Sequence, residues 1–115
     1  MADLKLNSGA RFGLGEPMVA AICDVFSLHP EVDEVVLYGS RAKGNYKVGS
    51  DIDLSMKGKA LDFALLSTIN QQLYDLPIPY TVDLSILADI SNPNLVEHIQ
   101  RVGQVFYRKD SEHGG

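Results

Sequence analysis

Two segments of the chain alternate between apolar and polar residues, and this alternation constrains the fold more than any other feature. The apolar members are Ile52, Leu54 and Met56 in the first segment and Val82, Leu84 and Ile86 in the second. Because successive side chains of a β-strand point to opposite faces, each segment predicts a strand with one face in the core. The opposite face is polar and includes Asp51 and Asp53 in the first segment and Asp83 in the second.

A further strand precedes these two, and helices alternate with the strands along the chain. The continuous apolar run Val35-Val36-Leu37-Tyr38 is typical of a strand buried on both faces at the middle of a sheet, and Gly39-Ser40 ends it. Helical spacing of apolar residues predicts helices over about 16–28, 61–74 and 93–102, with a short turn or helix over 41–44 and a closing strand over 105–107. The expected fold class is α/β (α+β), a small mixed β-sheet with helices packed on one face and carboxylates on the other.

The length of 115 residues fits one domain over 1–115, with a core of about 16–107 and flexible ends. The net charge is -5 and the ten Lys and Arg residues are dispersed, so direct binding to a nucleic-acid backbone is not expected. No apolar run approaches the roughly 20 residues of a membrane span, and the N-terminus lacks the regions of a signal peptide. A single cysteine, Cys23, cannot form an internal disulfide. These features predict a cytoplasmic protein with no membrane partner.

Three carboxylates on neighbouring polar strand faces suggest a metal site. Asp51 and Asp53 project from one side of their strand, and Asp83 has the same position on the next apolar strand, about 4.8 Å away if the two strands are neighbours. Carboxylates this close repel one another unless they are protonated or bridged by cations, and a set of hard oxygen ligands without His or Cys suits magnesium. The alternative is an acidic, solvated face. Gly39-Ser40 favours the metal site, because glycine lets the backbone approach a phosphate and Ser40 offers a hydroxyl.

The order and spacing of these residues also resemble a known family. Gly39-Ser40, ten further residues, Asp51-Ile52-Asp53 and the later strand carboxylate Asp83 resemble the nucleotidyltransferase superfamily that includes DNA polymerase β. More narrowly, the stretches 37–44 and 49–54 resemble the minimal nucleotidyltransferases of prokaryotes. The resemblance implies a nucleotidyltransferase palm fold and in-line attack by an acceptor oxygen on the α-phosphorus of a nucleoside triphosphate such as ATP.

The resemblance also implies roles for single residues. Asp51 and Asp53 are expected to hold two Mg²⁺ ions, and Asp83 to complete the site of the ion that activates the attacking hydroxyl. Ser40 is expected to bind the terminal phosphates, Gly39 to allow their close approach and Arg41 to contact a phosphate. Lys43 is interpreted either as a phosphate contact or as a solvated loop residue. Tyr46 and Lys47 are interpreted as exposed, with base or acceptor contacts as the alternative. His29 is interpreted as a helix-terminal residue, with a ligand role as the alternative, and His98 as a surface or packing residue.

The same resemblance implies a partner. Minimal nucleotidyltransferases are commonly encoded beside a small all-helical HEPN protein, and act as antitoxins that transfer AMP from ATP to a tyrosine of this ribonuclease partner. A hetero-oligomer with a HEPN protein is therefore expected. Two alternatives stay open: nucleotidyl transfer to a small molecule such as an aminoglycoside, and a nucleotide-binding subunit that neutralises its partner by contact only.

Overall fold

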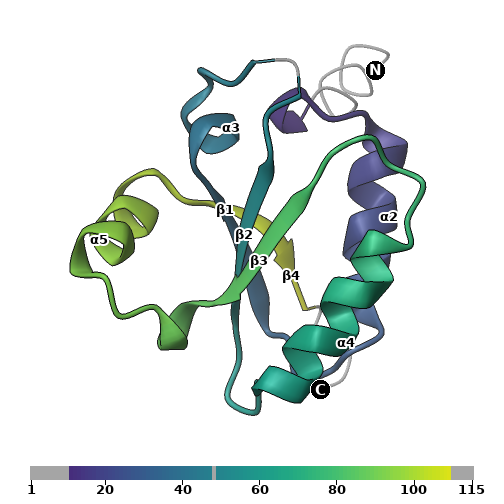
Figure 1. Cartoon of the computed structure of the whole chain (residues 1–115), viewed down its shortest axis with the longest axis vertical. Coiled ribbons are helices and arrows are strands. Elements are labelled where there is room, and N and C mark those ends of the chain that lie inside the picture. The colour runs from purple at the N-terminus through teal and green to yellow at the C-terminus, as the bar shows by residue number, and fades with distance from the viewer. Residues whose placement is uncertain (1–10, 48, 110–115) are drawn as a thin grey trace.

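A computed structural model describes residues 11–47 and 49–109. Its centre is a four-stranded mixed sheet with the order β3-β2-β1-β4 (Figure 1). The strands are β1 (Glu34–Tyr38), β2 (Ile52–Lys57), β3 (Val82–Ile86) and β4 (Gln104–Arg108). β1 pairs antiparallel with β2 and with β4, whereas β2 and β3 are parallel. The strands predicted from the sequence are therefore present, with β1 in the interior of the sheet as its apolar run indicated.

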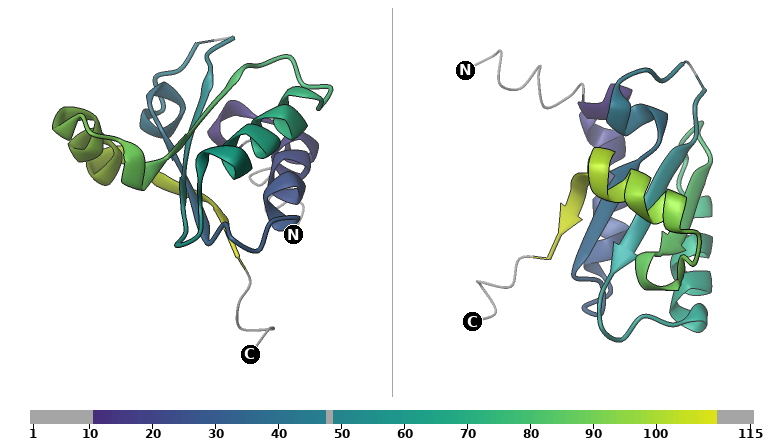
Figure 2. Two further views of the ribbon diagram at one scale, coloured as in Figure 1. Left: turned by 60° about the horizontal axis from the view of Figure 1, so that its bottom comes forward. Right: turned by 90° about the vertical axis from the view of Figure 1, so that its left-hand side faces the viewer.

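Two helices cover one face of the sheet, and a third lies across the other. The longer elements are α2 (Glu16–Ser27), α4 (Phe63–Tyr74) and α5 (Pro93–Val102), and the short ones are η1 (Arg11–Gly13), α3 (Ser40–Lys43) and η2 (Leu87–Asp89). Figure 2 shows α5 on one side of the sheet with α2 and α4 on the other. The mixed fold is as predicted, but helices are not confined to one face.

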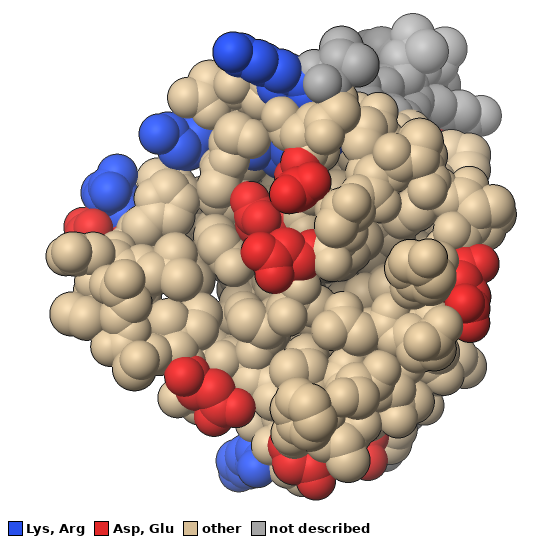
Figure 3. Space-filling model, in the orientation of Figure 1, with Lys and Arg blue, Asp and Glu red and all other residues tan. Residues whose placement is uncertain are grey.

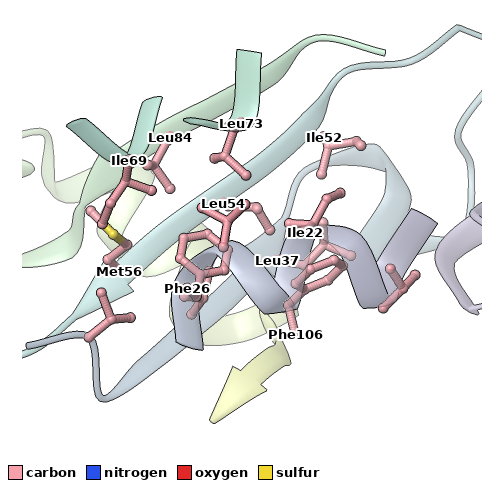
Figure 4. Packing of buried hydrophobic residues seen from close by; sticks show 14 of the residues in the cluster. Ile22, Phe26, Leu37, Ile52, Leu54, Met56, Ile69, Leu73, Leu84 and Phe106 are labelled. Carbon is pink, nitrogen blue, oxygen red and sulfur yellow. The ribbon is translucent and has the colours of Figure 1, made fainter. Parts of the chain in front are cut away.

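The main core lies between the sheet and the helices α2 and α4 (Figure 4). The alternating apolar residues of β2 and β3 point into it, and Ile52, Leu54 and Met56 are fully buried there. From α2 and α4, Ile22, Phe26, Ile69 and Leu73 pack against them. This arrangement confirms the face assignment made from the period of two, and leaves the polar sides of β2 and β3 on the opposite face of the sheet.

The position of α5 follows from the apolar character of β1 on both faces. Val35 and Leu37 belong to the main core, whereas Val36 and Tyr38 form a second, smaller cluster with Ile99 of α5. A strand in the interior of a sheet with apolar residues at consecutive positions needs cover on both sides, and α5 supplies it on the second side. The same helix thereby lies next to the face that carries the carboxylates.

Capping residues account for the helix boundaries. The carboxylate of Asp62 accepts a hydrogen bond from the backbone N–H of Leu65 at 2.9 Å, so α4 begins at Phe63, two residues later than the apolar spacing suggested. The side chain of Asn92 caps α5 in the same way, and Pro93 occupies the first helical position. Within 11–47 and 49–109, none of the helices has the length and apolar character that crossing a membrane requires.

Candidate active site

Asp53 and Asp83 are directly opposite each other on the parallel strands β2 and β3. Asp51 comes one residue before β2, and the alternation of β2 places it on the same side as Asp53. Asp51 and Asp83 are exposed and Asp53 is half-buried. Figure 3 shows acidic side chains gathered beside a hollow near the middle of one face of the molecule, apart from those at its periphery. The sequence-predicted carboxylates are thus brought to one face, at adjacent positions.

The electrostatics of Asp53 reflect this arrangement. Its pKa is raised above the ordinary value, first by burial of the carboxyl and then by the negative charges of Asp83 and Asp51, while a protonated His98 would act in the opposite direction. The pKa of Tyr38 is also raised, mainly by burial and further by the charges of Asp83 and Asp53, with a hydrogen bond to Ser85 opposing the change. Negative charge is therefore concentrated at this site, and a cation there would be stabilised.

Gly39 forms the turn between β1 and α3, directly against Asp53. Its φ of 77° and ψ of -156° lie in a region that side chains other than glycine rarely adopt. A Cβ atom at this position would collide with Oδ2 of the Asp53 carboxylate. Ser40, the next residue, is the first residue of α3 and is only partly buried. The Gly39-Ser40 turn therefore lies directly beside the carboxylate of Asp53.

A layer of hydroxyl groups continues the polar face of β2 and β3 beyond the carboxylates. The hydroxyl of Ser85 lies 2.9 Å from that of Ser55, which is fully buried. Among the described residues, all buried polar side-chain atoms have a hydrogen-bond partner. The Ser55–Ser85 bond ties β2 to β3 two residues along from Asp53 and Asp83, and this helps to fix the positions of both carboxylates.

Arg41 is not placed where a phosphate contact was expected. Its side chain is only 3% exposed, and its guanidinium donates to the backbone carbonyls of Ser50 at 2.9 and 3.2 Å and of Phe12 at 3.0 Å. The guanidinium also lies over the rings of Tyr80 and Tyr46, 4.6 and 5.1 Å from their centroids. Its planar set of donors thus fastens η1 and the segment before β2 to α3. These contacts give Arg41 a structural role, and the phosphate contact stays a prediction.

The other residues singled out from the sequence differ in their exposure and in their distance from the site. Tyr46 is 37% exposed with its ring beside Gly13, and Lys43 and Lys47 are exposed. His98, interpreted from the sequence as a packing or surface residue, reaches the site: its Nε2 atom accepts the N–H of Gly39 at 3.3 Å. Its spacing from the apolar residues Leu95, Ile99 and Val102 of the same helix could have indicated that it faces the sheet.

The donor set fits magnesium, which prefers oxygen ligands and retains positions for water and substrate phosphates. As the side chains stand, no group of three or more His, Cys, Asp or Glu residues within the described ranges is placed to hold a metal ion. The pairing of β2 with β3 nevertheless brings Asp53 next to Asp83. A metal ion at these residues would therefore need further ligands or a change in the side-chain positions.

Comparison with known proteins decides the family. The family model for polymerase beta nucleotidyltransferases matches residues 20–112, which include the Gly39 turn, all three aspartates and His98. The chain belongs to this family. Its domain is therefore a nucleotidyltransferase domain, and the carboxylates and the Gly39-Ser40 turn lie within the matched region. A search of curated proteins found no match.

Solved structures with this nucleotidyltransferase fold include several toxin-antitoxin complexes. A toxin-antitoxin structure with AMP-PNP superimposes with a TM-score of 0.64 at 20% identity, over 84% of this chain and 77% of the other. The MNT antitoxin complex with a tri-AMPylated HEPN toxin from Shewanella oneidensis gives 0.60 at 18%, over 86% and 76%. The toxin-antitoxin MntA-HepT gives 0.61 at 18%, over 86% and 77%. At these identities the similarity establishes the fold.

Proposed function

We propose that this nucleotidyltransferase moves AMP from ATP to a hydroxyl group of a HEPN partner protein, and so acts as an antitoxin. The observation that carries the proposal is the register of β2 and β3, which puts Asp53 opposite Asp83 and beside the Gly39 turn. A nucleotide with its terminal phosphates at Gly39-Ser40 would have its α-phosphate near the carboxylates. In this arrangement the leaving pyrophosphate lies at the Gly39-Ser40 turn, and the acceptor approaches from the side of the carboxylates.

Asp51 and Asp53 are the residues we assign to hold both magnesium ions, with Asp83 completing the site on the acceptor side. Bound magnesium supplies positive charge that neutralises the triphosphate and makes the attacking hydroxyl more acidic. The protein's own contribution is to hold the carboxylates at fixed separations. Its parallel β2–β3 pairing and the Ser55–Ser85 bond beside it perform this task.

The reaction we infer forms one phosphorus–oxygen bond and breaks another. The acceptor oxygen attacks the α-phosphorus, the bond from that phosphorus to the bridging oxygen of the β-phosphate breaks, and pyrophosphate leaves with that bond's electrons. The hydroxyl proton passes to solvent water on the exposed side of the site, where Asp83 lies. Ser40 and the backbone at Gly39 hold the leaving pyrophosphate. No covalent intermediate with the enzyme is needed.

The nature of the acceptor is inferred from the structural neighbours. The three solved structures described above are toxin-antitoxin complexes, and in one of them the HEPN toxin carries AMP groups. Asp83 and Asp51 are exposed, so an acceptor on the surface of another protein can reach them. We infer that a tyrosine of the HEPN partner is the acceptor and that the partner orients it, since positioning supplies most of the catalysis in phosphoryl-type transfer.

A labelling experiment tests this proposal. The chain is incubated with magnesium, ATP labelled on the α-phosphate, and the HEPN protein encoded beside it, and we expect label on that protein. Asp51→Asn and Asp83→Asn should abolish the transfer while leaving association with the partner intact. Asp89→Asn is the matched control, because Asp89 is an exposed carboxylate on η2, outside the site.

Two outcomes would replace the proposal. If Asp51→Asn and Asp83→Asn neutralise the partner in cells as fully as the wild type, neutralisation occurs by contact and modification is not the mechanism. If label from a cell extract is found on a small molecule rather than on the partner, the acceptor is a small hydroxylated compound.

A further inference from the structure

His98 connects α5 to the turn between β1 and α3. Its Nε2 atom lies 3.3 Å from the backbone nitrogen of Gly39, and its ring packs edge-on against Tyr38 with centroids 6.3 Å apart and planes at 81°. A ring nitrogen that accepts an N–H must carry a lone pair, so the neutral tautomer with its proton on Nδ1 makes this bond. His98 is half-buried, and α5 is anchored next to it by Ile99.

The Gly39 turn needs such external contacts to adopt one conformation. Glycine visits positive φ about as readily as negative φ, so the backbone at Gly39 has little intrinsic preference for its observed angles. Asp53 bounds the turn on one side, since its carboxylate occupies the space of the missing Cβ. His98 bounds it on another side through the N–H. A turn held at both places is preorganised for a ligand.

We propose that His98 is a positioning residue that holds the Gly39-Ser40 turn in the conformation that receives the terminal phosphates of the nucleotide. The inference rests on the proposed function, because it assigns His98 a role at the phosphate end of that site. Without the hydrogen bond from the Gly39 N–H to Nε2 of His98, the turn samples other conformations. The apparent affinity for the nucleotide then falls in proportion to the fraction of molecules with a competent turn.

Three substitutions separate this role from a direct charge contact with the triphosphate. His98→Ala removes the acceptor. His98→Gln retains a carbonyl oxygen near the position of Nε2 and carries no charge, whereas His98→Lys supplies a cation that accepts no hydrogen bond. A positioning role therefore predicts that Gln restores the function and Lys does not, and a charge contact predicts the reverse.

The matched control is His29, on the far side of the sheet. Its Nε2 lies 2.7 Å from Oε1 of Gln72. His29 comes just after the end of α2 and Gln72 belongs to α4, so this contact lies away from the site. His29→Ala thus removes a histidine side-chain hydrogen bond away from the site, one in which Nε2 donates to the amide oxygen of Gln72. Melting curves of all variants establish that each one is folded.

Calorimetric titration of the full chain with ATP and magnesium is the test. We expect His98→Ala and His98→Lys to weaken binding about fivefold, the effect of one neutral hydrogen bond, and His98→Gln and His29→Ala to bind like the wild type. Unchanged affinity of His98→Ala, or retention of affinity by Lys but not by Gln, overturns the proposal. If the wild type itself binds no ATP, the proposed function has failed.

A second measurement tests the His98–Gly39 contact without any nucleotide. In the ¹⁵N-labelled protein, we expect His98 as the neutral tautomer with its proton on Nδ1, and a shift of the Gly39 amide resonance in His98→Ala but not in His29→Ala. An amide resonance of Gly39 that does not respond to His98→Ala would refute the positioning role even if ATP binds normally.

Discussion

Replacing Asp53 by asparagine removes one negative charge from the most crowded part of the site. The pKa of Asp53 is raised by burial and by Asp83 and Asp51, so its ionised form destabilises the folded protein. Two unit charges across one strand spacing of about 4.8 Å repel by about 1 kcal/mol in water. Because Asp83 and Asp51 are exposed, solvent screens their charges, and the repulsion energy stays near this value for water.

We therefore expect Asp53→Asn to stabilise the metal-free protein by about 1 kcal/mol at neutral pH, which raises Tm by roughly 4 °C in a domain of this size. The direction in which the stability difference between the two proteins changes with pH follows from the raised pKa of Asp53. A carboxyl with a raised folded-state pKa stabilises the fold when protonated, and this contribution is lost as the pH rises through that pKa. The advantage of the asparagine variant should hence vanish as the pH falls below 3.8, the ordinary value of the group.

Thermal melting between acidic and neutral pH, with and without magnesium and ATP, provides the measurement. Adding magnesium and ATP should stabilise the wild type more than Asp53→Asn, because the variant has lost a ligand. Asp89→Asn removes a charge of the same kind outside the site and should leave both quantities unchanged. A variant that melts below the wild type in the absence of metal would show that Asp53 is stabilised by a favourable partner, which refutes the crowding argument. An equal gain from magnesium and ATP in both proteins would exclude Asp53 as a ligand.

Other substitutions address the turn and its support. Gly39→Val should abolish ATP binding in calorimetry, because its side chain would displace the Asp53 carboxylate and strain the positive φ, and wild-type affinity would remove the turn from the site. Ser40→Ala should weaken ATP binding by about 1 kcal/mol, the value of one neutral hydrogen bond, and no change would exclude a hydroxyl contact. Arg41→Lys should lower the free energy of unfolding in urea by about 2 kcal/mol, since lysine keeps the charge but not the forked set of bonds to Ser50 and Phe12. If Arg41→Lys instead keeps full stability and loses only ATP affinity, the main role of Arg41 is to contact a phosphate.

The sequence was sufficient to predict the strands and their faces because a period of two is a local property. Ile52 and Leu54 are buried and Asp53 is on the other side, as alternation requires. The alignment of Asp53 with Asp83 was only a condition in the prediction, because it depends on how the crossover through α4 sets the register of a parallel pair.

The contacts that the sequence did not indicate all join distant parts of the chain. Arg41 follows Gly39-Ser40 directly, but the single turn of α3 directs its side chain toward Phe12 and Ser50. His98 is 59 positions from Gly39, and only the docking of α5 on β1 brings them together. The cover that α5 gives to the second face follows from Val36 and Tyr38, whose burial on that side was already implied by the apolar run.

The location of β3 at the edge of the sheet has a consequence for the dynamics of the site. Among the described strands β3 pairs only with β2, whereas β2 lies between two strands, so Asp83 and Asp53 belong to segments with different opening free energies. An edge strand can detach from its neighbour by local unfolding that leaves the rest of the sheet intact. Each such event separates the two carboxylates, so a nucleotide and metal ion that bridge them, as the proposed function requires, would have to dissociate before β3 opens. In that function, nucleotide binding lowers the population of the open β3, and hydrogen exchange along β3 is expected to be slower in the nucleotide-bound protein than in the free protein.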